Sequence, residues 1–265
     1  MNRYTPFLET QALTIGRFDH PEHKEHTDPA SETSREYSIN FVEHGAFWIR
    51  TDDGYWQLRS GQIFLSYPGM QYECHHDEVM PRDRCLSVCY VKENGGPDFQ
   101  EFERTARHSP VIGISNRTGY LRWQLARVVD GIAAEELSAE LLIEVRSRAG
   151  ENQRTFRERQ LNWYAERVDA VQEKIVKTFD CDHSLFALAR GVGMSTFHFA
   201  RVFRQLTGLP PHRFLREVRL KEAAHRLRNG ASVTEACFGC GFQNLSHFTR
   251  SFERRFGIRP SRYVI

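Results

Sequence analysis

The sequence lacks the long apolar run that a membrane span requires, since no stretch of it approaches roughly 18 apolar residues in succession. Its first residues, Met1 to Leu8, also lack the apolar core of a signal peptide. We therefore expect a soluble protein of the cytoplasm.

Familiar catalytic motifs are missing as well. The chain contains no recognisable Ser/His/Asp order, no phosphate-binding glycine loop and no motif of paired carboxylates. We therefore expect no enzyme activity and no cofactor.

Cysteine is scarce, with six residues in the chain. In a cytosolic protein these are expected to be reduced thiols or metal ligands rather than disulfides. Side chains alternate along a strand, so Cys74 and His76 share a face of one expected strand, and Cys85 and Cys89 share a face of the next.

A hairpin turning at Val79 and Met80 would set Cys74 opposite Cys85. With His76, these thiols are candidate ligands for zinc or another soft metal, or a redox pair. The alternative is that the cysteines, including Cys89, pack as small apolar side chains. The sequence favours packing and predicts no metal site.

Charge is unevenly distributed along the chain. From residue 168 onward there are 16 Lys and Arg against 8 Asp and Glu, a net charge of +8. The preceding residues carry 20 against 26, a net charge of −6. A basic tail on an acidic front indicates that the tail meets a polyanion, or merely that it has a solvated basic face.

Residues 1 to about 110 have the pattern of short strands separated by turns. β-Branched and aromatic residues are frequent in 37–42 and 46–50. Further strands are expected at 55–59, 62–66, 71–76 and 85–91, because turn residues separate these segments. This spacing predicts an antiparallel sandwich or small barrel.

From about Asn116 the apolar period becomes helical. Leu121, Leu125, Val128 and Ile132 would share one face, and so would Leu137, Leu141 and Val145. This apolar face either packs on the β domain or pairs two copies of the chain. A polar linker is expected at 149–159, and everything after about Asn162 is predicted to be helical.

One segment of the chain occurs twice at an offset of 49 residues. His198, Phe199, Arg201 and Phe203 return as His247, Phe248, Arg250 and Phe252. The match continues through Gly208 and Gly257 and through Pro211 and Pro260. A unit used twice indicates one recognition task performed at two places.

Each copy has the pattern of a helix-turn-helix: a short helix, a turn with glycine and a second, capped helix. Ser195 and Asn244 are expected N-caps of the second helices, and Ser232 with Glu235 forms a capping box. Such second helices enter the major groove of DNA, where Arg201 and Arg250 would read bases or clamp phosphates.

The expected DNA-binding residues lie on the outward face or at the start of these two helices. They are Thr196, Phe197, Ala200, Arg201, Arg204, Gln243, Asn244, Ser246, Arg250 and Arg254. Phe197 and Ala200 cannot hydrogen-bond a base, so we expect them to contact thymine methyl groups or the sugar-phosphate wall.

Residues 168–265 resemble the AraC/XylS family of bacterial transcription regulators. The resemblance rests on 188–195, 199–204, 208–211, 219–223, 240–242 and 248–260. It implies two helix-turn-helix units joined by a long helix over about 211–227, with recognition helices in successive major grooves. That separation corresponds to one turn of B-DNA, roughly 34 Å.

The front half resembles, more loosely, the cupin-like jelly-roll sensor often attached to such domains. The resemblance implies a cupin-like effector-sensing β domain over 1–115, a helical dimerisation segment with linker over 116–161, and a double helix-turn-helix domain over 162–265. The expected partners are double-stranded DNA, an unidentified small-molecule effector and a second copy of the chain, with RNA polymerase as a further candidate.

Three alternatives compete with a sequence-specific regulator. The chain is a cupin-like metal-dependent enzyme tethered to DNA, a redox- or metal-responsive regulator that uses Cys74 and Cys85, or a non-specific nucleoid protein. The front half lacks the His-x-His…Glu pattern of metal-dependent cupin enzymes. Effector, target site and sign of regulation are not encoded in any motif.

Overall fold

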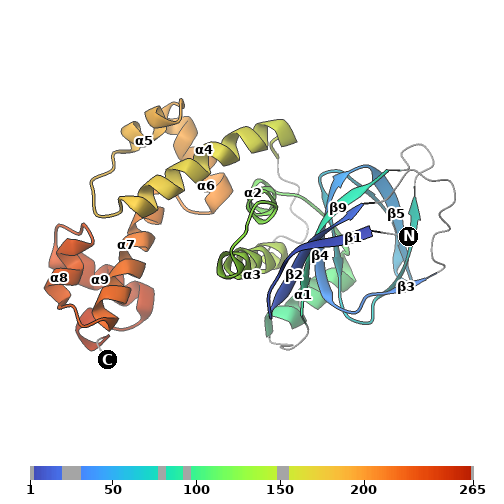
Figure 1. The fold of residues 1–265 in the computed structure, drawn as a ribbon, viewed down its shortest axis with the longest axis horizontal. Helices are drawn as coiled ribbons and strands as arrows, with labels where there is room; N and C mark the ends of the chain where they lie inside the picture. The colour runs from blue at the N-terminus through green and yellow to red at the C-terminus, as the bar shows by residue number, and fades with distance from the viewer. Residues whose placement is uncertain (1–2, 20–30, 77–81, 92–96, 148–154, 264–265) are drawn as a thin grey trace. The chain divides into compact units, whose positions relative to one another are not determined.

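The computed structural model describes residues 3–19, 31–76, 82–91, 97–147 and 155–263 (Figure 1). The chain forms two compact units, Met1–Arg157 and Glu158–Ile265. The first combines two β-sheets with three helices, and the second is helical. The boundary expected at residue 162 falls inside α4 (Glu158–Lys177), and most of the expected linker lies outside the described residues.

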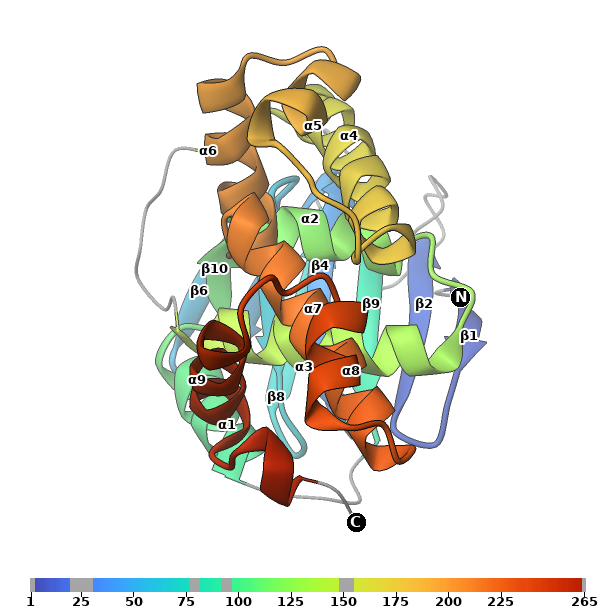
Figure 2. The same cartoon turned by 90° about the vertical axis from the view of Figure 1, so that its left-hand side faces the viewer.

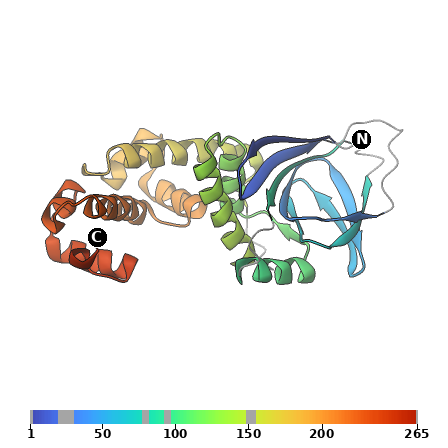
Figure 3. The ribbon, with the colours of Figure 1, turned by 60° about the horizontal axis from the view of Figure 1, so that its bottom comes forward.

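The first unit is built from two antiparallel sheets, as predicted (Figure 3). The larger has the order β1-β2-β9-β4-β7-β10, with β1 (Arg3–Glu9), β2 (Leu13–Asp19), β9 (Arg84–Tyr90), β4 (Tyr37–His44), β7 (Gln62–Ser66) and β10 (Val111–Gly113). The smaller has the order β3-β8-β5-β6, with β3 (Glu32–Thr33), β8 (Gln71–His76), β5 (Ala46–Thr51) and β6 (Gly54–Arg59).

The two faces of the larger sheet differ in chemistry. In register across β4, β7 and β9, one face carries fully buried aliphatic and aromatic side chains: Ile39, Phe41, Ile63, Leu65, Leu86 and Val88. The opposite face carries mainly polar and thiol side chains: Ser38, Asn40, Ser66, Cys85, Ser87 and Cys89. The apolar face therefore supplies the core, and the polar face is available to line a cavity.

Three helices complete the apolar core of the first unit: α1 (Pro97–His108), α2 (Asn116–Leu125) and α3 (Gly131–Ser147). Helix α1 was not predicted, and its Phe102 and Ala106 are buried in this core. The Tyr90 hydroxyl on β9 donates a 2.8 Å hydrogen bond to the Ser138 carbonyl on α3, which ties helix to sheet.

The apolar periodicity of 116–147 therefore reflects packing within one chain. Leu121, Leu125, Leu141 and Val145 are buried in the core of the first unit rather than exposed as a seam between copies. The single face expected for 121–132 is also wrong, because α2 ends at Leu125 and Ile132 is 74% exposed on α3. Periodicity had identified a buried face without identifying what covers it.

The second unit consists of helices α4 to α9 and a short 3-10 turn. They are α4, α5 (Leu185–Gly191), α6 (Thr196–Thr207), α7 (Pro211–Arg228), α8 (Val233–Gly239), α9 (Leu245–Phe256) and η1 (Pro260–Arg262). Helix α7 runs from the group formed by α4, α5 and α6 to the group formed by α8 and α9 (Figure 2). Among the described residues, no helix has the combined length and apolarity of a membrane span.

Each of the helices α6 and α9 buries one apolar face. Phe199, Val202, Phe203 and Leu206 on α6 are fully buried. Phe248 and Phe252 on α9 are equally buried, in a cluster with Leu220 and Leu227 of α7 and Cys237 of α8. Each group thus has its own aromatic core, and α7 contacts both groups.

Arg219 on α7 connects these groups through the backbone. Its guanidinium donates to three carbonyls: Phe179 at 2.7 Å, Cys181 at 2.9 Å and Gly241 at 2.7 Å. The first two follow α4, and the third lies in the turn before α9. Gly241 has a φ of +76°, and a β-carbon there would lie 2.6 Å from the Asp180 carbonyl oxygen, so glycine is required.

We predict that Arg219→Ala destabilises the second unit. Three carbonyls lose a charged hydrogen-bond donor in this variant. The expected decrease in the free energy of unfolding is about 2 kcal/mol, because the site is only part-buried. Urea unfolding followed by circular dichroism measures it. Arg190→Ala on the exposed side of α5 is the control, and equal stability of the two variants would refute the role of Arg219.

Candidate functional site

Helices α5 and α6, and helices α8 and α9, form two helix-turn-helix motifs. The first helices begin after N-caps Ser184 and Ser232, which are 48 residues apart, whereas the second helices begin after Ser195 and Asn244, which are 49 apart. The second turn is therefore one residue longer. The extra residue lies between Gly241 and Asn244, because the first turn has an equivalent glycine of positive φ, Gly193, two residues before its N-cap Ser195.

The predicted caps are confirmed except in one detail. Asn244 accepts a hydrogen bond from the His247 amide at 2.9 Å, and Ser232 and Glu235 form a reciprocal capping box. Ser195 occupies the N-cap position of α6, but its hydroxyl makes no capping bond. The recognition helices end alike, at Gly208 and Gly257, both in the left-handed conformation.

The residues predicted to contact DNA are accessible on the two recognition helices. Two of the ten, Thr196 and Ala200, are half-buried, and the other eight are exposed: Phe197, Arg201, Arg204, Gln243, Asn244, Ser246, Arg250 and Arg254. Phe197 is 92% exposed. No described element of the chain covers this ring.

The two equivalent arginines are held differently. His198 Nδ1 lies 3.1 Å from a terminal nitrogen of Arg201, and His198 Nε2 lies 2.9 Å from the hydroxyl of Tyr164 on α4. Because arginine only donates, Nδ1 must accept, so this geometry selects the neutral Nε2–H tautomer of His198. Arg250 instead donates from Nε to the Ser246 carbonyl of its own helix at 3.3 Å.

A basic groove between α7 and α9 was not predicted. It is lined by Arg213, Arg216, Arg254 and Arg255, the last of which pairs with Glu217 at 2.7 Å. Arg254 thus lies beside two arginines of α7.

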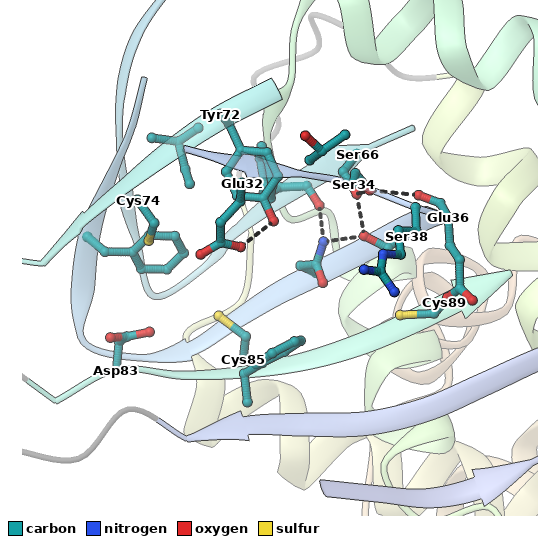
Figure 4. A pocket seen from close by; sticks show the side chains of 17 residues that line it. Glu32, Ser34, Glu36, Ser38, Ser66, Tyr72, Cys74, Asp83, Cys85 and Cys89 are labelled. Carbon is teal, nitrogen blue, oxygen red and sulfur yellow. Dashed lines mark hydrogen bonds between the residues drawn. The ribbon is translucent and has the colours of Figure 1, made fainter. Parts of the chain in front are cut away.

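The first unit contains a cavity of about 400 Å³ (Figure 4). Its walls come from the polar face of the larger sheet, from the smaller sheet and from the segment around β3. One wall is a hydrogen-bonded network in which Ser66 Oγ lies 2.7 Å from Ser38 Oγ and 3.0 Å from Ser34 Oγ. The volume is within the range of cavities that hold small molecules.

The cysteines line this cavity, although not as a hairpin. Strand β8 pairs with β3 and β5, whereas β9 pairs with β2 and β4, so Cys74 and Cys85 belong to opposing sheets. Cys74, Cys85 and Cys89 nonetheless all line the cavity (Figure 4). The turn expected at 79–80 and the side chain of His76 lie outside what the structure describes.

The environment of the thiols favours their neutral form. Burial raises the pKa of Cys85 well above its ordinary value. Burial, followed by the charge of Glu36, raises the pKa of Cys89 to about 11. Among the described residues, no three His, Cys, Asp or Glu side chains are grouped as metal ligands. Since the thiolate is the reactive and metal-binding form, these observations favour the packing interpretation.

We predict that Cys85 and Cys89 react slowly with iodoacetamide in the folded protein. A thiol with a pKa near 11 is ionised to only about one part in a thousand at pH 8, and the rate should climb as the pH rises toward 11. Exposed Cys181 should be modified first and buried Cys237 slowly, as measured by peptide mass spectrometry. Modification of Cys85 or Cys89 as fast as Cys181 would restore the thiol-sensing alternative.

Two families of known domains match the two units. The AraC-like ligand binding domain matches residues 11–148, and a helix-turn-helix domain matches residues 188–264. The first match covers the β-sheets and helices around the cavity. The second covers both helix-turn-helix motifs from Leu188 onward.

Curated relatives resemble the second unit. The HTH-type transcriptional activator RhaS of Escherichia coli strain SE11 is 40% identical over 75 residues, covering 28% of this chain and 27% of RhaS. The HTH-type transcriptional regulator MtrA of Neisseria gonorrhoeae is 28% identical over 102 residues, covering 38% of this chain and 34% of MtrA. The matches therefore span about a quarter to a third of these relatives.

Two solved structures match this chain over a similar share of its length and at similar sequence identity. A probable AraC family transcriptional regulator from Rhodopseudomonas palustris is 33% identical, with a TM-score of 0.35, covering 37% of this chain and 94% of that one. The DNA-binding domain of AdpA, solved with a target DNA, is 28% identical, with a TM-score of 0.35, covering 37% and 88%. The AraC-like ligand binding domain alone matches more than half of this chain, and a helix-turn-helix domain follows it. This chain therefore belongs to the AraC/XylS family.

Proposed function

We propose that this protein is a transcription regulator that binds specific double-stranded DNA sequences through α6 and α9. The observation that carries the proposal is the repeated placement of an exposed arginine, Arg201 and Arg250, on the outer face of two helix-turn-helix motifs. Both motifs belong to a part of the chain with a net charge of +8, which attracts the phosphate backbone.

Three further features support DNA as the partner. The ring of Phe197 is solvated at the start of α6, where it would contact a thymine methyl or the sugar wall. Gln243 and Asn244 lie at the start of α9, where phosphates are favoured by free backbone N–H groups. Arg213 and Arg216 would add phosphate contacts next to α9.

We propose that a small effector occupies the cavity of the first unit and shifts the protein between two states of DNA binding. The cavity belongs to the region that matches an AraC-like ligand binding domain. Relatives named as transcriptional activators and regulators favour this role over an enzyme tethered to DNA. RNA polymerase stays a predicted partner.

We predict that Arg201→Ala and Arg250→Ala each weaken binding to a preferred DNA site by about 1–3 kcal/mol, because each removes a base-reading guanidinium. The site is first selected from random genomic fragments with the full-length protein. Fluorescence anisotropy then compares the selected duplex with a scrambled one.

Lys177→Ala is the matched control, since Lys177 is an exposed cation of the same unit paired with Glu173 at 2.9 Å. The ratio of affinity for the selected duplex to affinity for the scrambled duplex is the measure of specificity. If the arginine variants keep the wild-type ratio, neither arginine reads a base. A wild-type protein that shows no preference at all would favour the nucleoid alternative.

We also propose that two copies pair through the outer side of α3. Ile132 and Ile143 are 74% and 56% exposed, and their spacing of eleven residues, about three helical turns, places them on one side of the helix. Exposed aliphatic side chains at this spacing suit contact with a second apolar surface.

We predict that the full chain sediments as a dimer and that Ile143→Glu shifts it to monomer, because a buried carboxylate would oppose pairing. Sedimentation equilibrium measures the mass. Val176→Glu, at an exposed apolar position of α4, should leave the mass unchanged. A wild-type monomer at all concentrations would disprove pairing.

A further inference from the structure

The cavity of the first unit has an uneven charge. The described residues that line it include three carboxylates, Glu32, Glu36 and Asp83, and a single cation, Arg35. Asp83 is 5% exposed and Glu32 is half-buried, whereas Arg35 and Glu36 are exposed to solvent. In the view of Figure 4, Glu32 lies between Asp83 on the left and Glu36 on the right. An anionic ligand would therefore meet like charge on several sides.

The carboxylate of Glu32 is fixed by the cavity wall. It accepts a 3.1 Å hydrogen bond from the Tyr72 hydroxyl, which comes from β8 of the smaller sheet. Burial and the nearby charge of Glu32 both raise the pKa of Tyr72, so this hydroxyl stays a donor and adds no second anion. One oxygen of Glu32 is thereby oriented by the Tyr72 hydroxyl.

Aromatic rings form much of the remaining wall. Phe18, Phe47, Phe64 and Tyr72 all line the cavity, and Phe64 meets Tyr72 edge to face at 5.3 Å between ring centroids. Aromatic faces attract alkylammonium groups, and carboxylates supply the opposite charge. The combination is suited to a cationic nitrogen attached to an apolar body.

Other ligand classes fit less well. A metal ion would need at least three ligands, and the described residues contain no such group. A neutral polyol would need free hydrogen-bonding partners, but Ser38 bonds to Ser66 at 2.7 Å and accepts from Asn40 at 2.6 Å. The thiols of Cys85 and Cys89 are kept neutral, so they supply no positive or negative partner.

We infer that the cavity binds an organic ammonium compound, with the cationic nitrogen beside Glu32 and the apolar part against the aromatic wall. This inference rests on the proposed role of the cavity as the effector site. It adds the chemical class of the effector. Glu32 is the residue on which the charge preference depends most, because its carboxylate is both fixed and half-buried.

The test uses the full-length protein and three compounds that share one apolar body: 3-phenylpropylamine, 3-phenylpropanol and 3-phenylpropanoate. Calorimetry should show the amine binding at least tenfold more tightly than the alcohol, and no binding of the carboxylate. Glu32→Gln, which can still accept from Tyr72, should reduce amine affinity at least tenfold. Glu135→Gln, an exposed change on α3, should leave it unaltered.

Asp83→Asn provides a second variant if Glu32→Gln alters the melting temperature of the unliganded protein. The inference is overturned if the carboxylate or the alcohol binds as tightly as the amine. It is also overturned if both variants bind the amine with wild-type affinity, or if none of the three compounds binds. DNA binding is measured on the same samples. If the protein binds DNA but shows no preference for the amine, the proposed function as a regulator holds and only the ammonium inference is wrong. If it binds the amine but not DNA, only the proposed function as a regulator is wrong.

Discussion

A single side chain, Arg219, ties together the parts of the second unit that must keep a fixed spacing. Its three hydrogen bonds reach the backbone that follows α4 and the turn that precedes α9. Helix α7, with 18 residues, is about 27 Å long. Under the proposed function, α6 and α9 would fit successive major grooves only if neither rotates about α7, and the carbonyls held by the Arg219 guanidinium restrict that rotation.

The first unit meets a different constraint, because one sheet must serve both a core and a cavity. Aliphatic residues such as Ile39 and Val88 face the helices, and alternate residues such as Ser38 and Cys89 face the cavity. Buried polar groups on the cavity side lower stability unless they are hydrogen-bonded. Ser34, Ser38 and Ser66 are hydrogen-bonded to one another there. The helices on the outer side provide the compensating apolar burial.

Much of the fold could be predicted because its signals are local. Capping residues such as Ser232 and Asn244, and period-2 or helical spacing, depend on near neighbours in sequence. Helix α1 was missed since its region was interpreted as strands and turns throughout. The Cys74–Cys85 hairpin was wrong because consecutive strands of a sandwich can belong to different sheets. The bond from Tyr164 to His198 spans 34 residues, and no local pattern encodes it.

The two motifs are not interchangeable, and this difference gives the protein a polarity. Arg201 is hydrogen-bonded to a histidine that is itself bonded to Tyr164 of α4, whereas Arg250 donates to a carbonyl of its own helix. The second turn is also one residue longer. Under the proposed function, the first arginine loses less conformational freedom on docking than the second. A single copy would thus favour an asymmetric DNA site, in which the half that contacts α6 tolerates fewer base changes than the half that contacts α9. Such a site would orient the protein in one direction along the promoter.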